Sequence, residues 1–235
     1  TKGHPPKYNP SGIIKKMYED NLIDKENLVV HFQGGDIGVL KEFNQLVELF
    51  EEYGYKRIDI CTNNIIYQPT IERILSKNKG TLSLSLDCGT RKTYLKIKQT
   101  DKFNKYIENL RNYISATEYK STIVVNYIIV LGVNDNFKEI TKFINLMKKI
   151  GVKTVGLRLD HNYSNAWIEK SIPLNNCPEN LDKLILHFFK LANKNKLKMD
   201  MSCKEQNETI LKVFRTNKGK QRKISFFDKI KKVFR

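Results

Sequence analysis

The feature that most constrains the fold is a regular alternation of apolar strand-like runs and amphipathic helical stretches. Runs rich in β-branched residues predict strands at 28–33, 57–61, 81–87, 121–131, 154–160 and 197–203. One-sided periodicity predicts helices at 11–21, 39–53, 70–76, 101–117, 137–150 and 179–195. Continuous apolar strands are typical of parallel sheets covered by helices. We therefore predict an α/β fold, a partial (β/α) barrel of parallel strands with outer helices. A doubly wound open sheet is the alternative.

No linker-like segment divides the chain before about residue 205, and the tail after it has a different, strongly basic composition. We expect one barrel domain over residues 1–205 and a basic C-terminal tail or helix over 206–235. In the tail, Ile224, Phe227, Ile230 and Phe234 lie near helical spacing among basic residues. Such a helix can contact an anionic membrane or a partner. We favour the alternative that it packs on its own domain or leads to a further one.

The net charge is strongly positive, since 42 Lys+Arg against 25 Asp+Glu gives +17. A balance of this kind can indicate nucleic acid, anionic membranes or acidic metabolites as partners. We expect no specific nucleic-acid binding, because the lysines lie on solvated helix faces and no RNA-binding, zinc-finger or helix-turn-helix pattern is present. Weak contact of the tail with an anionic surface stays open. No run approaches the ~18 apolar residues of a membrane span, and no leader precedes the domain, so we expect a cytoplasmic protein.

The cysteines predict neither a metal site nor a disulfide framework. Four are present, at Cys61, Cys88, Cys177 and Cys203, and none forms a CxxC pair. Widely separated cysteines in a chain without a leader are expected to be free thiols.

One candidate binding segment follows the first predicted strand, where Gly34 and Gly35 precede Asp36. Bare backbone at the carboxyl end of a parallel strand lets a ligand approach closely, and the acid adds a negative charge. Strand–Gly-Gly–helix also occurs as ordinary turn chemistry, so this segment alone is weak support.

Further polar residues follow the other predicted strands, where chemistry gathers in parallel α/β folds. The full candidate set is Gly34, Gly35, Asp36, Thr62, Asn63, Asn64, Ser85, Asp87, Asn126, Arg158 and Asp160. Each has a structural alternative: residues 87–90 as a turn with a helix N-cap, 62–64 as a capped loop, and Arg158 with Asp160 as a salt bridge. Together they predict a site for a ligand with amine, carboxylate and hydroxyl groups.

The order of these segments resembles the radical S-adenosylmethionine (SAM) enzymes. The motifs are Gly34-Gly35-Asp36, Thr62-Asn63, Ser85-Leu86-Asp87, Val125-Asn126 through Gly132-Val133-Asn134-Asp135, and Leu157-Arg158-Leu159. They cover about residues 10–200 and are most similar to the branch with the molybdenum-cofactor and anaerobic sulfatase-maturing enzymes. Five motifs in one order are more specific than any one of them.

The resemblance implies a role for each motif. Gly34, Gly35 and Asp36 match the Gly-Gly-Glu segment that holds the methionyl amine of SAM. Ser85 and Asp87 match residues near the SAM ribose or carboxylate, and Thr62 and Asn63 match residues that face SAM and substrate. Arg158 matches an arginine near the cofactor. Asn126 completes the expected cofactor-binding set, and no catalytic residue is assigned.

The chain departs from the family pattern in two places. It lacks the CxxxCxxC that ligates a [4Fe–4S] cluster, and it begins where that loop would end, so we expect the ligands upstream of Thr1 and none in this chain. A naturally cluster-free relative is the alternative. Val124 stands where the molybdenum-cofactor branch commonly has a lysine for the SAM carboxylate, so another cation, such as Arg158, has to take that role.

By resemblance, the full-length protein is an enzyme that cleaves SAM reductively to a 5′-deoxyadenosyl radical, which abstracts hydrogen from a substrate. It would need an electron donor, and its small-molecule or peptide substrate is not indicated. This chain alone is expected to be inactive. Two other functions stay open: a cluster-free barrel that binds a nucleoside or nucleotide, and a non-enzymatic module whose basic tail targets a membrane or nucleic acid.

Overall fold

A computed structural model describes residues 9–33, 37–160 and 180–200 of the chain. The helices and strands follow in this order: α1 Pro10–Glu19, β1 Val29–Phe32, η1 Ile37–Val39, α2 Phe43–Tyr53, β2 Arg57–Thr62, α3 Pro69–Ser76, β3 Gly80–Ser85, α4 Arg91–Lys98, α5 Phe103–Ser115, η2 Lys120–Thr122, β4 Ile123–Ile129, α6 Phe137–Ile150, β5 Thr154–Leu159, α8 Leu181–Lys194 and β6 Lys198–Asp200.

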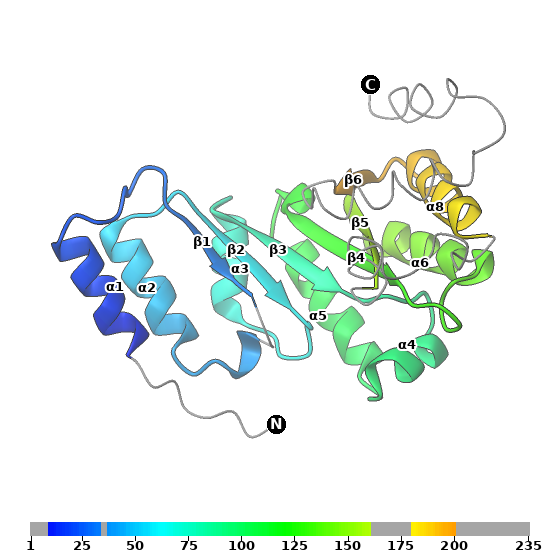
Figure 1. The fold of residues 1–235 in the computed structure, drawn as a ribbon, viewed down its shortest axis with the longest axis horizontal. Helices are drawn as coiled ribbons and strands as arrows, with labels where there is room; N and C mark the ends of the chain where they lie inside the picture. Colours follow the sequence, from blue (N-terminus) through cyan, green and yellow to red (C-terminus); the bar gives the residue numbers. More distant parts are fainter. Residues whose placement is uncertain (1–8, 34–36, 161–179, 201–235) are drawn as a thin grey trace, which may run out of the picture.

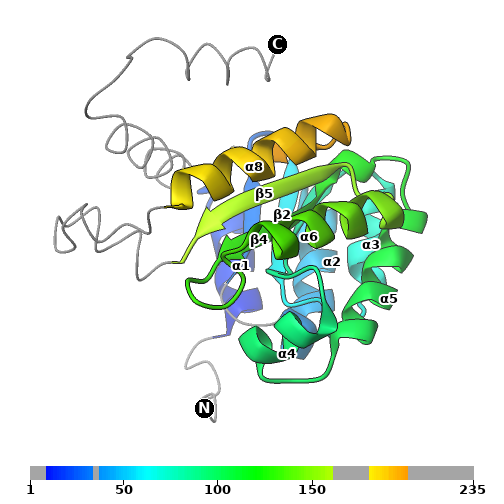
Figure 2. The same ribbon diagram turned by 90° about the vertical axis from the view of Figure 1, so that its right-hand side faces the viewer.

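The described strands form one six-stranded parallel sheet in the order β1-β2-β3-β4-β5-β6 (Figure 1). Strand order therefore equals chain order, with no reversal. A doubly wound sheet would change direction, so this alternative is wrong. Right-handed crossovers that always step the same way place their helices on one side of the sheet. Figure 2 shows α3, α5 and α6 gathered on that side. The predicted α/β fold of partial-barrel type is confirmed.

Local sequence explains where the helices begin and end. Asn9, Thr90 and Asn136 each cap a helix by accepting a hydrogen bond from a backbone N–H in its first turn. At the other end of α6, Gly151 adopts a φ of 92°, which stops the helix in the left-handed conformation that glycine tolerates.

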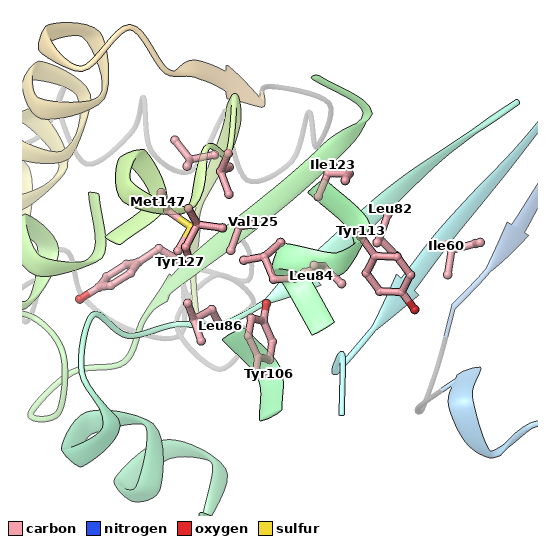
Figure 3. Close-up of a cluster of buried hydrophobic side chains, with 14 of the residues drawn as sticks. Ile60, Leu82, Leu84, Leu86, Tyr106, Tyr113, Ile123, Val125, Tyr127 and Met147 are labelled. Carbon is pink, nitrogen blue, oxygen red and sulfur yellow. The ribbon is translucent and has the colours of Figure 1, made fainter. Parts of the chain in front are cut away.

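The core lies between the sheet and its helices. Ile60, Leu82, Leu84, Val125 and Tyr127 project from the strands toward helix side chains, as Figure 3 shows. These strand residues are almost completely buried. On each strand the apolar residues occupy every second position, so their side chains share one face of the sheet.

Two predictions fall on parts of the chain that the structure does not describe. The Gly34–Asp36 segment and the whole basic tail over 206–235 lie outside the described residues. Among the described helices, none is long and apolar enough to cross a membrane. The division at residue 205 stays a prediction.

Candidate functional site

The face of the sheet that the core does not use carries polar and small side chains. Alternation along the strands places His31, Asp59 and Cys61, then Thr81, Ser83, Ser85, Asn126, Gly156, Arg158 and Asp200 on this side, which we call the polar face. Small residues on a sheet surface leave room above the backbone for a ligand. The candidate site lies on this face.

One straight row crosses four strands of the polar face. Ser85 on β3 is the register partner of Asn126 on β4, Asn126 of Gly156 on β5, and Gly156 of Asp200 on β6. We call these four residues the polar row. Ser85 and Asp200 end their strands, at the edge where ligands bind in parallel α/β folds, while Asn126 and Gly156 lie near the middle of β4 and β5.

Asn126 is the most unusual member of the polar row. Its Nδ2 donates to Ser83 Oγ at 2.8 Å and to the Leu84 carbonyl at 3.4 Å. Its side-chain Oδ1 has no hydrogen-bond partner within the described residues, although Asn126 is only 8% exposed. Buried acceptors are almost always paired in native proteins, so this oxygen indicates a missing donor such as a ligand or an ordered water.

Gly156 is required by the position of that oxygen. A Cβ atom built on Gly156 would lie 2.1 Å from Asn126 Oδ1 and 3.4 Å from Arg158 Nη1. The first distance is far inside van der Waals contact, so only glycine leaves the space that the amide oxygen enters. Asn126 Oδ1 and Arg158 Nη1 thus both lie close to the bare Cα of Gly156.

Asp87 follows the end of β3 and is almost completely buried, at 2% exposure. Its Oδ1 accepts from the backbone N–H of Ile128 at 2.9 Å, and its Oδ2 accepts from Ser85 Oγ at 2.5 Å and Lys98 Nζ at 2.6 Å. The predicted ligand-binding acid is thus engaged by groups of its own chain.

Lys98 is a site residue that sequence reasoning missed. It ends α4 and reaches back to the end of β3, where Nζ also lies 3.3 Å from Ser85 Oγ. Residues 87–90 were interpreted as a turn with a helix N-cap, but the charged surface of α4 gives little apolar periodicity, so α4 itself was not predicted. Lys98 places a cation beside the polar row.

The loop that carries Asp87 is fixed by α6. The buried Glu139 carboxylate accepts from the Gly89 backbone N–H at 2.8 Å and from Thr90 Oγ1 at 3.1 Å. A Cβ on Gly89 would lie 2.3 Å from the Phe143 backbone nitrogen, so the loop packs directly on the helix. Burial, with Asp87 and Glu139 nearby, raises the pKa of the Cys88 thiol in this loop, which keeps it protonated rather than nucleophilic.

Arg158 pairs with Asp200 on the adjacent strand β6. Its Nη1 also donates to the carbonyls of Leu157 at 3.2 Å and Asp200 at 3.3 Å. The salt bridge considered from the sequence was with Asp160 instead. Asp200 escaped prediction because its closeness to Arg158 depends on the register of β5 with β6.

The structure brings some predicted residues together and separates others. Ser85, Asp87, Asn126 and Arg158 lie at or beside the polar row. Thr62 projects to the core side, is 6% exposed, and accepts from the Asn64 backbone N–H at 3.2 Å. Asn63, next to it, is exposed after the end of β2. The assignment of these residues to ligand binding stays a prediction.

The polar groups of the candidate site suit SAM, one of the two expected cofactors. Hydroxyl, amide and ammonium groups around an unpartnered acceptor suit the polar groups of SAM. In the described ranges 9–33, 37–160 and 180–200, no group of three or more His, Cys, Asp or Glu side chains could hold a metal ion. These residues therefore do not fit a [4Fe–4S] cluster.

Comparison with known proteins points to one superfamily. A family model described as "Radical SAM superfamily" matches residues 2–147, more than half of the chain. A probable GTP 3′,8-cyclase from Saccharolobus islandicus is 25% identical over 130 residues, which cover 54% of this chain and 40% of that protein. The molybdenum cofactor biosynthesis protein 1 of Dictyostelium discoideum is 24% identical over 158 residues, covering 67% of this chain and 24% of that protein.

Solved structures agree on the fold. SuiB of Streptococcus suis, bound to its precursor peptide SuiA, aligns with a TM-score of 0.60 at 14% identity, covering 97% of this chain and 49% of that chain. A structure named native anSMEcpe with bound AdoMet aligns with a TM-score of 0.55 at 15% identity, covering 80% of this chain and 53% of that chain. The chain thus spans about half the length, or less, of the proteins it matches.

Proposed function

Because the chain belongs to the radical SAM superfamily, we propose that it is the SAM-holding part of a radical SAM enzyme, with SAM lying over the polar row. Membership implies SAM and a [4Fe–4S] cluster as the cofactors of the family. The observation that carries the proposal is the buried Asn126 Oδ1, which has no partner within the described residues and belongs to the register partner of Ser85 at the carboxyl end of β3.

The residues of the site divide the polar groups of SAM between them. Ser85 and Asn126 would contact the ribose hydroxyls, and Lys98 and Arg158 offer cations for the carboxylate. By the family resemblance, Gly34, Gly35 and Asp36 would hold the methionyl ammonium. SAM, when reduced through the cluster, supplies the radical that abstracts hydrogen, while the protein binds, orients and shields it.

No group of three or more His, Cys, Asp or Glu side chains in the described residues could hold a metal ion, so the cluster ligands have to come from outside them. The four cysteines of the chain are not spaced as a CxxxCxxC motif. The electron donor, the substrate and a role of the basic tail stay predictions. The activities of the relatives do not transfer to this chain, because the shared region covers less than half of those proteins.

SAM titration into the chain and its variants tests the proposal. We expect Ser85→Ala and Asn126→Ala each to weaken SAM binding by about three- to tenfold, the effect of losing a neutral hydrogen bond. Ser76→Ala is the matched control, because Ser76 ends α3 and donates to the Arg73 carbonyl at the surface. Equal affinity of Ser85→Ala, Asn126→Ala and Ser76→Ala would remove the polar row from the SAM site.

The Gly-Gly-Asp segment has its own test in the full-length protein reconstituted with its cluster. Asp36→Ala should lose about 1.5–3 kcal/mol of SAM binding, or roughly ten- to a hundredfold, because a charged hydrogen bond is lost. Asp36→Glu should be mild. Asp24→Ala is the control, since Asp24 contacts Glu26 and Asn27 in the turn before β1. If Asp36→Ala binds SAM as well as the parent does, the segment is a turn.

A further inference from the structure

The hydrogen-bond direction at Ser85 is set by Asp87. A hydroxyl has one proton to donate and two lone pairs. As a carboxylate, Asp87 can only accept, so the Ser85 proton points to Asp87 Oδ2, 2.5 Å away. Lys98 Nζ, 3.3 Å away, can only donate and takes one lone pair. What Ser85 has left for a ligand is one lone pair.

The orientation of the Asn126 side-chain amide is also set by its neighbours. The Leu84 carbonyl accepts only, so the side-chain atom facing it has to be Nδ2, and the second Nδ2 proton points to Ser83 Oγ. The free group of Asn126 is therefore the acceptor Oδ1. Two register partners on neighbouring strands both offer acceptors and no donor.

Asp87 is built to hold this arrangement. Its backbone has a φ of 63°, a conformation uncommon for a residue with a side chain. Asn134 Nδ2 donates to its carbonyl at 2.7 Å, and Ile128 N–H donates to its Oδ1 at 2.9 Å. A conformation of this kind persists where its surroundings over-determine it, and such positions cluster at ligand sites.

We propose that Asp87 is a positioning residue that makes Ser85 an acceptor, so that Ser85 and Asn126 together select a ligand group that donates hydrogen bonds. This inference rests on the proposed function and deepens it. A ribose diol, which can donate two hydrogen bonds, is a group of this kind. An ether oxygen, a fluorine or a carboxylate at that place has no proton to donate. It would face the lone pairs of Ser85 Oγ and Asn126 Oδ1.

Nucleoside analogues test the selection on the parent chain. Adenosine should bind about three- to tenfold more tightly than 2′-deoxyadenosine or 3′-deoxyadenosine, for at least one of the two positions. The analogue with fluorine at that position should bind no better than the deoxy compound, because fluorine keeps the size of a hydroxyl but donates nothing. Dissociation constants from NMR titration give the comparison. A fluoro analogue that binds like adenosine would overturn the inference.

Two variants assign the effect to Asp87. Asp87→Asn can keep the Ile128 contact and turn its Nδ2 toward Ser85, which frees the Ser85 proton, so the preference for hydroxyl over fluorine should shrink to what Asn126 Oδ1 alone provides. Lys96→Met removes an exposed charge from the same helix, outside the site, and should keep that preference. A smaller preference in both, or in neither, removes the role from Asp87. Circular dichroism melting establishes that each variant is folded, and the analogue series on the parent decides the selection without them.

The failure of the inference can be told from the failure of the proposed function. If Ser85→Ala leaves adenosine and SAM binding unchanged, the polar row is not the SAM site. If Ser85→Ala weakens adenosine but the parent treats hydroxyl and fluorine alike, the site stands and the selection by Asp87 is wrong.

Discussion

Leu84 and Ser85 are neighbours in the chain and point to opposite faces of the same strand. On the core face, Leu82, Leu84 and Leu86 are fully buried against helices. On the polar face, Ser83 and Ser85 contact Asn126 and Asp87. The core face is expected to supply most of the stability, because apolar burial dominates folding. The polar face keeps small side chains and an acceptor without a partner among the described residues, which cost stability and would serve the proposed ligand.

The largest expected effect comes from replacing one residue on each face by alanine and comparing the two variants. Leu84→Ala should lower the free energy of unfolding by about 2–5 kcal/mol, the usual cost of a cavity in a core. Ser85→Ala should cost less, about 1.5–3 kcal/mol for the lost hydrogen bond to the Asp87 carboxylate, and should also reduce SAM affinity. Urea denaturation and SAM titration on both variants give the comparison. If the two variants lose similar stability, the division of labour between the faces is wrong.

The next largest effect is expected at alkaline pH, which should lower the stability that the core face supplies. Burial raises the pKa of Tyr94 to about 12, and it raises the pKa values of Tyr106, Tyr127 and Cys88 as well. Their neutral forms are favoured in the folded state. This stability is present in full below the ordinary thiol and phenol pKa values and is lost as pH rises toward the raised ones.

Thermal melts between about pH 8 and pH 11 measure this loss, because ordinary Cys and Tyr pKa values lie near 8.5 and 10. The melting temperature should fall across that range. Tyr94→Phe should flatten the decline, since Phe has no proton to lose. A melting temperature that rises across the range would contradict the burial of these groups.

Gly156 tests the fit of the polar face itself. Gly156→Ala should cost about 1–3 kcal/mol, because the new methyl group meets Asn126 Oδ1 and the amide has to move. The double variant Gly156→Ala/Asn126→Ala should recover most of that loss, since the clashing oxygen is gone. Additive losses in the double variant would show that the two residues do not share this space.

The smallest effect is expected for an ion pair on the polar face away from the row. Arg57 is half-exposed and contacts Asp59 at 2.9 Å. Arg57→Gln should change the free energy of unfolding by about 0–1 kcal/mol, and less in high salt, because exposed pairs are screened. A loss above about 2 kcal/mol would place a stabilising network on the polar face, contrary to the comparison.

Sequence patterns predicted the core face better than the polar one. Periodicity located all six described strands, because buried apolar runs leave a strong signal. It missed α4, where Arg91, Lys92, Lys96 and Lys98 obscure the helical pattern. It expected one helix over 39–53, whereas the chain forms η1 and then α2. Local composition does not record the contacts that end or divide a helix.

The candidate site shows the same limit. Ser85 and Asn126 could be predicted because they lie at strand positions that a motif marks. Lys98 and Asp200 could not, because a helix return and a strand register bring them to the site. Thr62 was expected to face the ligand, but strand alternation from Cys61 turns it to the core. Register is a long-range property, and one residue of offset moves a side chain to the other face.

The order of the strands also has a consequence for synthesis. Every described strand after β1 pairs with the strand made just before it, so a sheet growing from its amino end can add one unit at a time. Ser85 and Asn126 can meet as soon as β4 has left the ribosome, but the Asp200 partner of Arg158 arrives last. The acceptor pair would be ready early, and the charged end of the row would close only when β6 docks.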